Sequence, residues 1–405
     1  MKTKKFTIII SLLLAVMFTL NATGSNETVT TAVPSDSSKT SSDAASVSTG
    51  TAIYTSDDLF SNRDLKQSAD LTDAQYITVE SGKDVTISSA GVYVISGSAK
   101  ETTVIVDATD EDKVQLVLDG LTITNTDFPC IYVKSADKVF ITTTDSTNTL
   151  KVTGSFTSDG DTNTDAVIFS KDDLVLNGVG SLVISSTDNG ITSKDDLKIT
   201  GGTISINCTS DALEANDSIR IADGNITIVS KKDGLHAEYD EDNSVGYIYI
   251  GGGSLNITAS DDAIHATTVV QIDGGEIKLA AREGIEGTYV QINGGTINIS
   301  ATDDGINAGK KSTSYAVTIE INGGYTTIKM SSGDTDAVDS NGNLYVNGGT
   351  IDITAQSSFD YDGTAKYTGG TIIVNGVTTN TINNQMMGGP GGGAMGGRGG
   401  FGGRF

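Results

Sequence analysis

One five-residue phrase recurs along the middle of the chain and constrains the fold more than any other feature. It occurs at Asp211-Ala-Leu-Glu-Ala, Asp233-Gly-Leu-His-Ala, Asp262-Ala-Ile-His-Ala, Glu283-Gly-Ile-Glu-Gly and Asp304-Gly-Ile-Asn-Ala, with degenerate copies at Asp165, Asn189, Asp336 and Asp360. Most copies are 21 to 24 residues apart, and two steps are longer, at 29 and 32 residues. Such a period is typical of a repeat protein, in which each unit packs mainly against its neighbours.

Two further apolar segments follow the phrase in each repeat. In one repeat these are Leu197-Lys-Ile-Thr-Gly-Gly and Thr203-Ile-Ser-Ile, and in another Val290-Gln-Ile-Asn-Gly-Gly and Thr296-Ile-Asn-Ile. The alternation of apolar and polar residues predicts short strands, and the glycines supply the positive φ of a tight corner. Because every strand has a copy in the next repeat, we expect it to pair with that copy. The sequence therefore predicts an all-β parallel β-helix with inward Ile, Leu and Val.

The ends of the chain differ in composition from the repeats. Lysines precede an apolar run from Phe6 to Leu20, which predicts a signal peptide over residues 1–24. A Ser/Thr-rich linker is expected over 25–52, the repeat domain over 53–378, and a disordered Gly/Met-rich tail over 379–405. We expect a secreted, extracellular or cell-surface-associated monomer with no transmembrane segment in the mature chain.

The charge of the chain restricts its partners. There are 51 acidic and 26 basic residues, for a net charge of −25. Nucleic acids and anionic membranes would be repelled, whereas multivalent cations would be attracted. The two cysteines, Cys130 and Cys208, are separated by several repeats. We interpret them as small buried apolar residues rather than a disulfide.

The first and fourth residues of the phrase are mostly acidic, which predicts a metal site. Neighbouring repeats of a parallel β-helix lie about 4.8 Å apart. A calcium ion with oxygen ligands at about 2.4 Å can therefore bridge two stacked carboxylates. Ca²⁺ is the expected cofactor, and the predicted ligands are Asp211, Glu214, Asp233, Glu238, Asp262, Glu283, Glu286, Asp304, Asn307, Asp336 and Asp339.

Two other interpretations of this acidic column stay open. His236 and His265 occupy the fourth position in two repeats, and imidazole prefers transition metals to calcium. Alternatively, the acidic residues only cap turns and face solvent, as we expect for Asp172, Asp195 and Asp217 at the next corner. Two insertions, at 239–246 and 310–315, enter directly after the phrase and are predicted to border a binding surface, where Asp240 and Asp242 would help to complete a site.

Three longer segments resemble a known family. They are Val114-Gln-Leu-Val-Leu-Asp-Gly-Leu-Thr-Ile, Ile168-Phe-Ser-Lys-Asp-Asp-Leu-Val-Leu-Asn-Gly-Val-Gly-Ser-Leu and Gly190-Ile-Thr-Ser-Lys-Asp-Asp-Leu-Lys-Ile-Thr-Gly-Gly-Thr-Ile. They are similar to exported carbohydrate-binding proteins of clostridia-like bacteria, over roughly residues 53–378. The resemblance implies a right-handed parallel β-helix of the pectate-lyase type with bound calcium. It also implies binding of plant cell-wall polysaccharides, including cellulose and acidic pectic sugars such as polygalacturonate.

The leading functional hypothesis is calcium-dependent, non-catalytic polysaccharide binding. Outward aromatic side chains would stack on the sugars, and the residues expected to contact the polysaccharide are Tyr239, Tyr249, Tyr289, Tyr345, His236 and His265. The first alternative is a pectate lyase with Arg282 as the base, for which Arg220 is less well placed. Hydrolysis by paired carboxylates and a structural adhesin are further alternatives.

Overall fold

The structure, a computed structural model, describes residues 50–333 and 335–385 of the chain. These residues belong to one compact unit, Ala44–Phe405. The predicted signal peptide, nearly all of the predicted linker and most of the Gly/Met-rich tail lie outside the described residues. Within the described part, no helix is long and apolar enough to cross a membrane.

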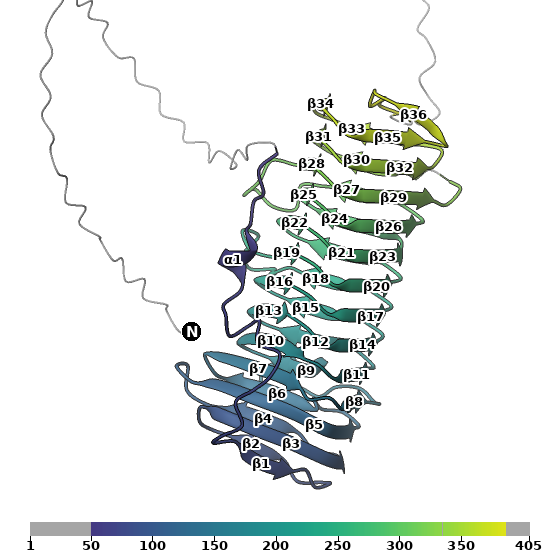
Figure 1. The fold of residues 1–405 in the computed structure, drawn as a ribbon. Coiled ribbons are helices and arrows are strands. Elements are labelled where there is room, and N and C mark those ends of the chain that lie inside the picture. Colours follow the sequence, from purple (N-terminus) through teal and green to yellow (C-terminus); the bar gives the residue numbers. More distant parts are fainter. Residues whose placement is uncertain (1–49, 334, 386–405) are drawn as a thin grey trace, which may run out of the picture. The chain divides into compact units, whose positions relative to one another are not determined.

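The described chain is an all-β structure with one four-residue helix, α1 (Ser56–Leu59), and with parallel pairing between successive repeats (Figure 1). The strands form three stacked columns, which we call ladders A, B and C. Ladders A and B share the long strands β3 and β5, whose first halves pair in ladder A and second halves in ladder B. Among the described residues, ladders A and B together form a 24-stranded sheet and ladder C a 12-stranded sheet.

Ladder A contains the strand that precedes the glycine pair in each repeat. Its members are β1 (Gln75–Thr78), β3 (Gly91–Lys100), β5 (Lys113–Asn125), β7 (Lys138–Thr143), β10 (Asp173–Gly178), β13 (Asp196–Ile199), β16 (Ser218–Ile221), β19 (Tyr247–Ile250), β22 (Val269–Ile272), β25 (Tyr289–Ile292), β28 (Thr318–Ile321), β31 (Asn343–Val346) and β34 (Ala365–Tyr367).

Ladder B contains the strand that follows the glycine pair. Besides β3 and β5, its members are β8 (Thr147–Val152), β11 (Ser181–Ser185), β14 (Thr203–Asn207), β17 (Asn225–Val229), β20 (Ser254–Thr258), β23 (Glu276–Ala281), β26 (Thr296–Ala301), β29 (Tyr325–Met330), β32 (Thr350–Thr354), β35 (Thr371–Val374) and β36 (Val377–Thr379). The last strand, β36, is antiparallel to β35 and ends the ladder.

Ladder C carries the recurring phrase. Its members are β2 (Val85–Ile87), β4 (Val104–Asp107), β6 (Ile131–Ser135), β9 (Ala166–Ser170), β12 (Asn189–Ser193), β15 (Leu213–Ala215), β18 (Leu235–Ala237), β21 (Asp262–Ala266), β24 (Glu283–Gly287), β27 (Ile306–Ala308), β30 (Val338–Ser340) and β33 (Asp360–Tyr361). The pairing of each strand with its copy, predicted from the period, is confirmed in all three ladders.

The core lies between the ladders and consists of stacked Ile, Leu and Val side chains. The third residue of the phrase points into it, as predicted, and Leu213, Ile264 and Ile306 are fully buried. The second glycine of each pair has positive φ where the chain turns from ladder A to ladder B, as at Gly295 (φ 88°). Cys130 and Cys208 are free and buried, which confirms their assignment as apolar core residues.

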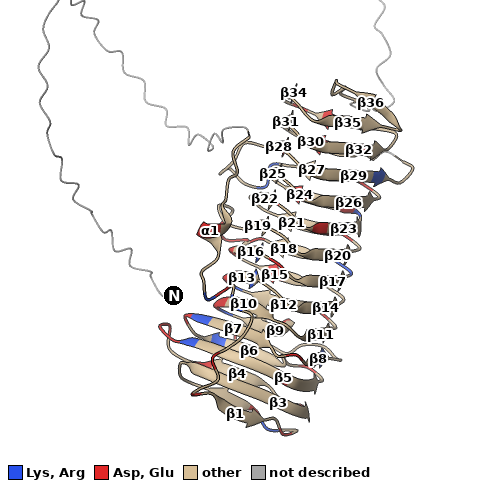
Figure 2. Cartoon of the chain, viewed as in Figure 1, with Lys and Arg blue, Asp and Glu red and all other residues tan. Residues whose placement is uncertain are grey.

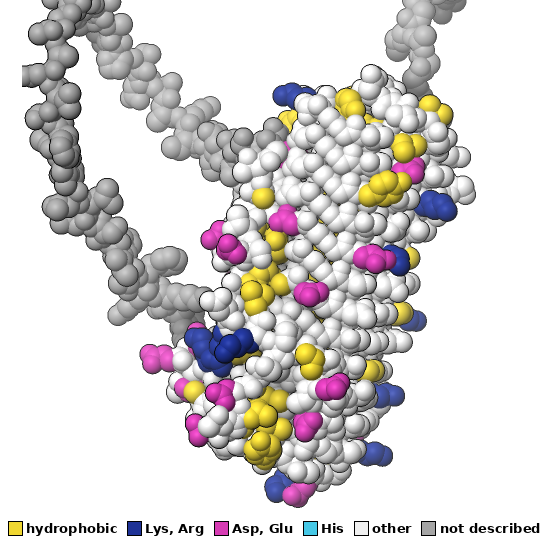
Figure 3. Space-filling view, in the orientation of Figure 1, with side chains coloured by type: hydrophobic (Ala, Val, Ile, Leu, Met, Phe, Trp, Pro, Cys, Tyr) yellow, Lys and Arg dark blue, Asp and Glu magenta, His cyan; other side chains and the backbone are white. Residues whose placement is uncertain are grey.

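Charged residues lie mainly at strand ends and in connections, because the strand interiors supply the core (Figure 2). On the face seen in Figure 3, hydrophobic side chains form small separate areas rather than one continuous patch. This distribution fits a stack in which most apolar side chains are buried in the core between the ladders.

Residues 50–67 run across the outer face of ladder A, and we call them the strap (Figure 1). The side chain of Gln271 holds the backbone of Tyr54 on both sides, accepting from its N–H at 2.8 Å and donating to its carbonyl at 2.9 Å. Further along, Thr200 Oγ1 and Asn177 Nδ2 donate to the carbonyl of Asp64. These contacts begin at Gly50, inside the range predicted as linker, whose N–H donates to Glu320.

Two predicted sugar-binding residues are buried on the outer face of ladder A. Tyr249 and Tyr289 point away from the core, as the alternation predicts, but they are only 2% and 3% exposed. Tyr249 packs against Phe60 of the strap, and its hydroxyl donates to Asp273 at 3.0 Å. The hydroxyl of Tyr289 donates to Glu320 at 2.8 Å. The prediction that these two rings are free to stack on a sugar is therefore wrong.

Candidate functional site

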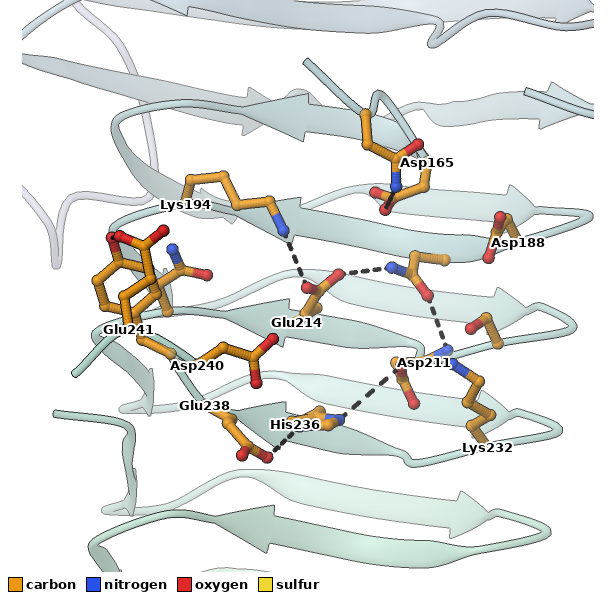
Figure 4. A pocket seen from close by; sticks show the side chains of 15 residues that line it. Asp165, Asp188, Lys194, Asp211, Glu214, Lys232, His236, Glu238, Asp240 and Glu241 are labelled. Carbon is orange, nitrogen blue, oxygen red and sulfur yellow. Dashed lines mark hydrogen bonds and ion pairs between the residues drawn. The ribbon is translucent and has the colours of Figure 1, made fainter. Parts of the chain in front are cut away.

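The acidic column lies on the outer face of ladder C, where the strand register places its side chains in two rows; Figure 4 shows residues from its first part. The first residue of each phrase forms one row. At several positions a side-chain oxygen of this row accepts a hydrogen bond from the backbone N–H of the same position in the next repeat. Asp211 accepts from Asp233 at 2.8 Å, and Asp233 accepts from Asp262 at 2.9 Å. This row therefore links the repeats and leaves its second oxygens for other partners.

The fourth residues of the phrase form the second row. The strand register aligns Glu214 with His236, His236 with His265, and His265 with Glu286; Asn307 and Asp339 continue the row. Their side chains point outward, because the third residue between the two rows points inward. The two rows bring carboxylate, imidazole and amide groups of successive repeats onto one surface.

A groove of about 640 Å³ lies over the first part of this surface (Figure 4). Its floor carries Glu214, which accepts hydrogen bonds from Thr192 Oγ1 at 2.9 Å and from Lys194 Nζ at 3.0 Å. The insertion at 239–246 forms one border. The groove is lined by Asn163, Asp165, Asp188, Asn189, Lys194, Ser210, Asp211, Glu214, Asn216, Lys232, His236, Glu238, Tyr239, Asp240 and Glu241.

One buried carboxylate oxygen in the groove lacks a hydrogen-bond partner. Asp165 Oδ1 is buried and has no hydrogen-bond partner, whereas its Oδ2 accepts from Asn163. Burial and the nearby charge of Glu214 raise the pKa of Asp165 to about 6. Such an oxygen is available to a cation, which would remove the electrostatic cost of ionising it.

The two histidines lie next to each other at the end of the groove, with ring centroids 4.9 Å apart. Burial lowers the pKa of His236, but the adjacent carboxylates of Asp211, Asp233 and Glu238 outweigh it and raise that pKa to about 12. The pKa of His265 is likewise raised to about 9, despite burial, by Asp262 and Glu286. In the absence of a metal, these imidazolium groups neutralise the middle of the acidic column.

Arg282 neutralises the next part of the column. Its guanidinium contacts the buried carboxylates of Glu283 at 2.7 Å and Asp262 at 3.3 Å. It also contacts the exposed carboxylates of Asp261 at 2.5 Å and Asp303 at 2.6 Å. Burial lowers the pKa of Arg282, but these carboxylates outweigh it and raise the pKa above its usual range. A general base needs a pKa near the working pH, so this environment opposes proton abstraction by Arg282.

Lys311, from the second insertion, completes this neutralised zone. Its ammonium contacts Glu286 Oε1 at 2.9 Å, and His265 Nδ1 lies 3.0 Å from Glu286 Oε2. Although burial opposes ionisation, these two cations lower the pKa of Glu286 to about 2. Both insertions thus bring side chains to ladder C, as their common position after the phrase predicts.

The column ends in carboxylates without a cation. Within the described residues, no lysine, arginine or histidine forms an ion pair with Asp304, Asp339 or Asp360. Burial, together with Asp339 and Glu283, raises the pKa of Asp304 to about 7, and burial with Asp360 raises that of Asp339 to about 6. Asn307 Nδ2 donates to Glu283, while its buried Oδ1 has no hydrogen-bond partner. Oxygen donors of this kind fit a hard cation such as Ca²⁺.

The remaining predicted residues are dispersed. Tyr239 borders the groove, and its hydroxyl donates to Glu241 at 3.0 Å. Tyr345 lies on ladder A and has Lys366 5.7 Å above its ring. Asp336 continues the first row, its N–H donating to Asp304 at 3.3 Å. Arg220 lies on ladder A rather than in the acidic column. Its guanidinium donates hydrogen bonds to Asp196 and to the carbonyl of Leu59 in the strap.

The insertion residues and the second-corner aspartates have separate roles. Asp240 lines the groove, whereas Asp242 accepts from Ser244 within the insertion's own turn. Asp172 accepts a hydrogen bond at 3.0 Å from the N–H of Ala136, which lies at the same corner one repeat earlier. For Asp195, burial with Asp173 and Asp217 raises the pKa to about 7.

Sequence reasoning missed several residues of the groove. Asp188, Lys194 and Lys232 line it, yet they lie just outside the five-residue phrase. Asp165 was seen only as a degenerate copy. Their signal is positional, because each lies within a few residues of a ladder C strand in the repeats at 165, 189, 211 and 233. Extending the phrase by two or three residues on each side would have included them.

Comparison with known proteins identifies the family. A family model described as "carbohydrate-binding domain-containing protein" matches residues 81–337 and 280–387. A protein of that description from Acetivibrio thermocellus is 38% identical over 130 residues, which cover 31% of this chain and 46% of the relative. The match thus spans about half the length of that relative.

A solved structure is also similar. It is described as a polysaccharide lyase-like protein from C. thermocellum, in a gadolinium derivative. It is 34% identical, with a TM-score of 0.49, and the match covers 51% of this chain and 90% of that chain. The resemblance to clostridial carbohydrate-binding proteins is confirmed by the family model and the relative. Because the family model spans more than half of the 405 residues, this chain belongs to the family of carbohydrate-binding domain-containing proteins.

Proposed function

We propose that this protein is a secreted, non-catalytic module that binds acidic plant cell-wall polysaccharide in the groove over ladder C, with Ca²⁺ bridging protein and sugar carboxylates. In this proposal the three ladders are the faces of a right-handed parallel β-helix. Membership of the family supports carbohydrate binding in general, and we assign that binding to the groove. The observation that carries the proposal is a groove of about 640 Å³ whose floor combines carboxylates with two lysines.

The groove has the groups that an acidic sugar chain needs. Lys194 and Lys232 offer ammonium groups to sugar carboxylates, and Lys232 is loosely held, with its nitrogen 3.7 Å from Asp211. Asp188 and Glu214 accept hydrogen bonds from sugar hydroxyls. Tyr239, at the border, offers a ring for stacking. Carbohydrate sites commonly combine a few well-placed polar groups with such an apolar surface.

Calcium is favoured by the oxygens that lack partners. Asp165 Oδ1 in the groove and Asn307 Oδ1 at the far end of the column are both buried without hydrogen bonds. Burial and the charge of Glu214 raise the pKa of Asp165 itself, and burial and like charge raise the pKa values of Asp304 and Asp339 near Asn307. Calcium takes six to eight oxygen ligands with flexible geometry, and sugar carboxylates or hydroxyls would fill its remaining positions.

A non-catalytic role is favoured over the pectate-lyase alternative by the surroundings of Arg282. Its guanidinium contacts four carboxylates, and its raised pKa opposes a role as base. Arg282 also lies outside the residues that line the groove. These two observations describe a group that neutralises the acidic column rather than one that abstracts a sugar proton.

Calorimetric titration tests the proposal. Chelator-stripped protein is titrated with Ca²⁺ and then with oligogalacturonate, with cello-oligosaccharide as the neutral comparison. We expect calcium uptake and calcium-dependent binding of the acidic sugar, weakened at least tenfold in Lys232→Ala and Asp165→Asn. Lys278→Ala, an exposed change on ladder B, is the matched control. Sugar binding that persists in chelator, or unsaturated product absorbing in the ultraviolet, would refute the proposal.

A further inference from the structure

The pair of histidines on ladder C has a geometry that calcium binding does not explain. Glu238, directly before the first insertion, places one oxygen, Oε2, 3.1 Å from His236 Nε2 and 3.6 Å from His265 Nε2. A ligand atom of each residue lies within 4.8 Å of those of the other two. Three donors from three residues thus converge on one small space.

These distances agree with tetrahedral zinc. Ligand atoms about 2.1 Å from a zinc ion are about 3.4 Å apart when the geometry is tetrahedral. The two measured nitrogen–oxygen distances lie on either side of this value. Imidazole nitrogens favour zinc and similar transition metals, whereas calcium takes oxygen ligands. The donor set is therefore better matched to zinc than to calcium.

Carboxylates lie beside the opposite nitrogens of both rings. His265 Nδ1 forms a hydrogen bond with Asp262 Oδ2 at 3.0 Å, whereas His236 Nδ1 lies 3.0 Å from Asp233 Oδ2 in an ion-pair contact without hydrogen-bond geometry. Ligating histidines in metal sites typically have their second nitrogen bound in this way, which fixes the tautomer and the ring orientation. These contacts direct both Nε2 atoms toward Glu238.

One of the converging nitrogens has no hydrogen-bond partner. His265 Nε2 is buried and unpaired, on a side chain that is 12% exposed. A buried polar atom without a partner is costly, and a bound ligand removes that cost. The unpaired Nε2 faces Glu238, and as an observation it does not depend on the number of acidic residues in the column.

We propose that His236, His265 and Glu238 bind one Zn²⁺ ion or a similar transition-metal ion, positioned by Asp233 and Asp262. His236 and Glu238 line the groove, so the fourth ligand is water or a sugar oxygen from the groove. The site depends on the insertion, since Glu238 precedes it directly. Zinc binding at this site requires neither calcium nor sugar, so it can be tested independently of the proposed polysaccharide binding.

The test measures zinc binding to the full chelator-stripped chain by equilibrium dialysis with millimolar Ca²⁺ present, and Co²⁺ binding by visible absorption. We expect one Zn²⁺ per chain and a tetrahedral Co²⁺ spectrum. Stoichiometric binding should be lost in His265→Gln and in Glu238→Gln; the second change is at a 41% exposed side chain and should leave folding intact. Asp233→Asn should weaken binding about 10- to 100-fold.

Glu276→Gln, an exposed carboxylate on ladder B, is the matched control and should bind zinc like the unmodified chain. The proposal is overturned if the unmodified chain binds no zinc, if calcium displaces it, or if the His265 and Glu238 variants retain it. Thermal melting of each variant establishes that the fold persists. Loss of sugar binding with zinc binding intact would refute only the polysaccharide proposal.

Discussion

Replacement of Arg282 by alanine tests whether this residue neutralises the acidic column. The change removes a guanidinium that contacts four carboxylates, two of them nearly buried: the side chains of Asp262 and Glu283 are 5% and 7% exposed. Asp261 and Asp303 are about half exposed. Without Arg282, the buried carboxylates keep their like-charge repulsion and lose their cation. We therefore expect the variant to fold but to be less stable.

The size of the loss follows from the exposure of each pair. Hydrogen bonds to charged groups contribute about 1.5–3 kcal/mol when buried, and exposed ion pairs about 0.2–1 kcal/mol. Arg282 itself is 42% exposed, so water replaces part of each interaction. Taking about 1 kcal/mol for each buried partner and about 0.5 kcal/mol for each exposed one gives a total loss of about 3 kcal/mol.

Urea unfolding in chelator, followed by circular dichroism, measures this loss. Lys278→Ala is the control. Among the described residues, the one ion pair of Lys278 is with the exposed Glu276 at 3.1 Å, so the change should cost below about 0.5 kcal/mol. Calcium at about 100 times its Kd would restore about 2.7 kcal/mol if it binds the uncovered carboxylates. A loss equal to that of Lys278→Ala would refute the neutralising role, and loss of a measurable lyase activity would reinstate Arg282 as a catalytic residue.

Three further predictions concern stability and the strap. The pKa of Asp195 is raised from 3.8 to about 7 in the folded chain. The resulting stabilisation is complete below about pH 3.8 and is lost as the pH rises through 7. Asp195→Asn should therefore make urea midpoints less pH-dependent between these two values. Gln271→Ala should speed hydrogen exchange at the N–H of Tyr54, because it removes both contacts that hold that residue; unchanged exchange would contradict the strap's attachment. Ile264→Ala, at a fully buried position, should cost about 2–5 kcal/mol, against under about 1 kcal/mol for the exposed Val183→Ala, as measured by urea midpoints.

The period of the phrase was sufficient to predict the ladders, because one rule repeats in every unit. The inward Ile or Leu, the glycine corner and the parallel partner all follow from local alternation. The same reasoning predicted that Tyr249 points away from the core, which is correct. It could not predict that the strap covers this ring, because residues 50–67 have no copy elsewhere in the chain. The apolar group at Tyr54, Leu59 and Phe60 was the available signal that this segment packs on something.

The site shows a similar division between what repeats and what does not. Alignment of Glu214, His236, His265 and Glu286 follows directly from the phrase and is present in the strand register. The cations that balance the acidic column come from irregular positions: Arg282, which contacts Glu283, precedes a phrase, and Lys311, which contacts Glu286, lies in an insertion. The sequence therefore indicated where the acidic groups gather. It did not indicate which of them are neutralised. The part of the column beside His265 and Arg282 is neutralised, whereas Asp304 and Asp339 have no ion pair with a described cation.

The hydrogen bonds of the first row all run in one sense, from the N–H of a later repeat to the carboxylate of the earlier one. A repeat inserted by duplication would meet an acceptor on one side and a donor on the other, so it would need no new interface. Chains of this type can thus change length one unit at a time during evolution. Every added unit would also extend each row of ladder C by one side chain, so under the proposed function the length of bound polysaccharide would increase with the number of repeats.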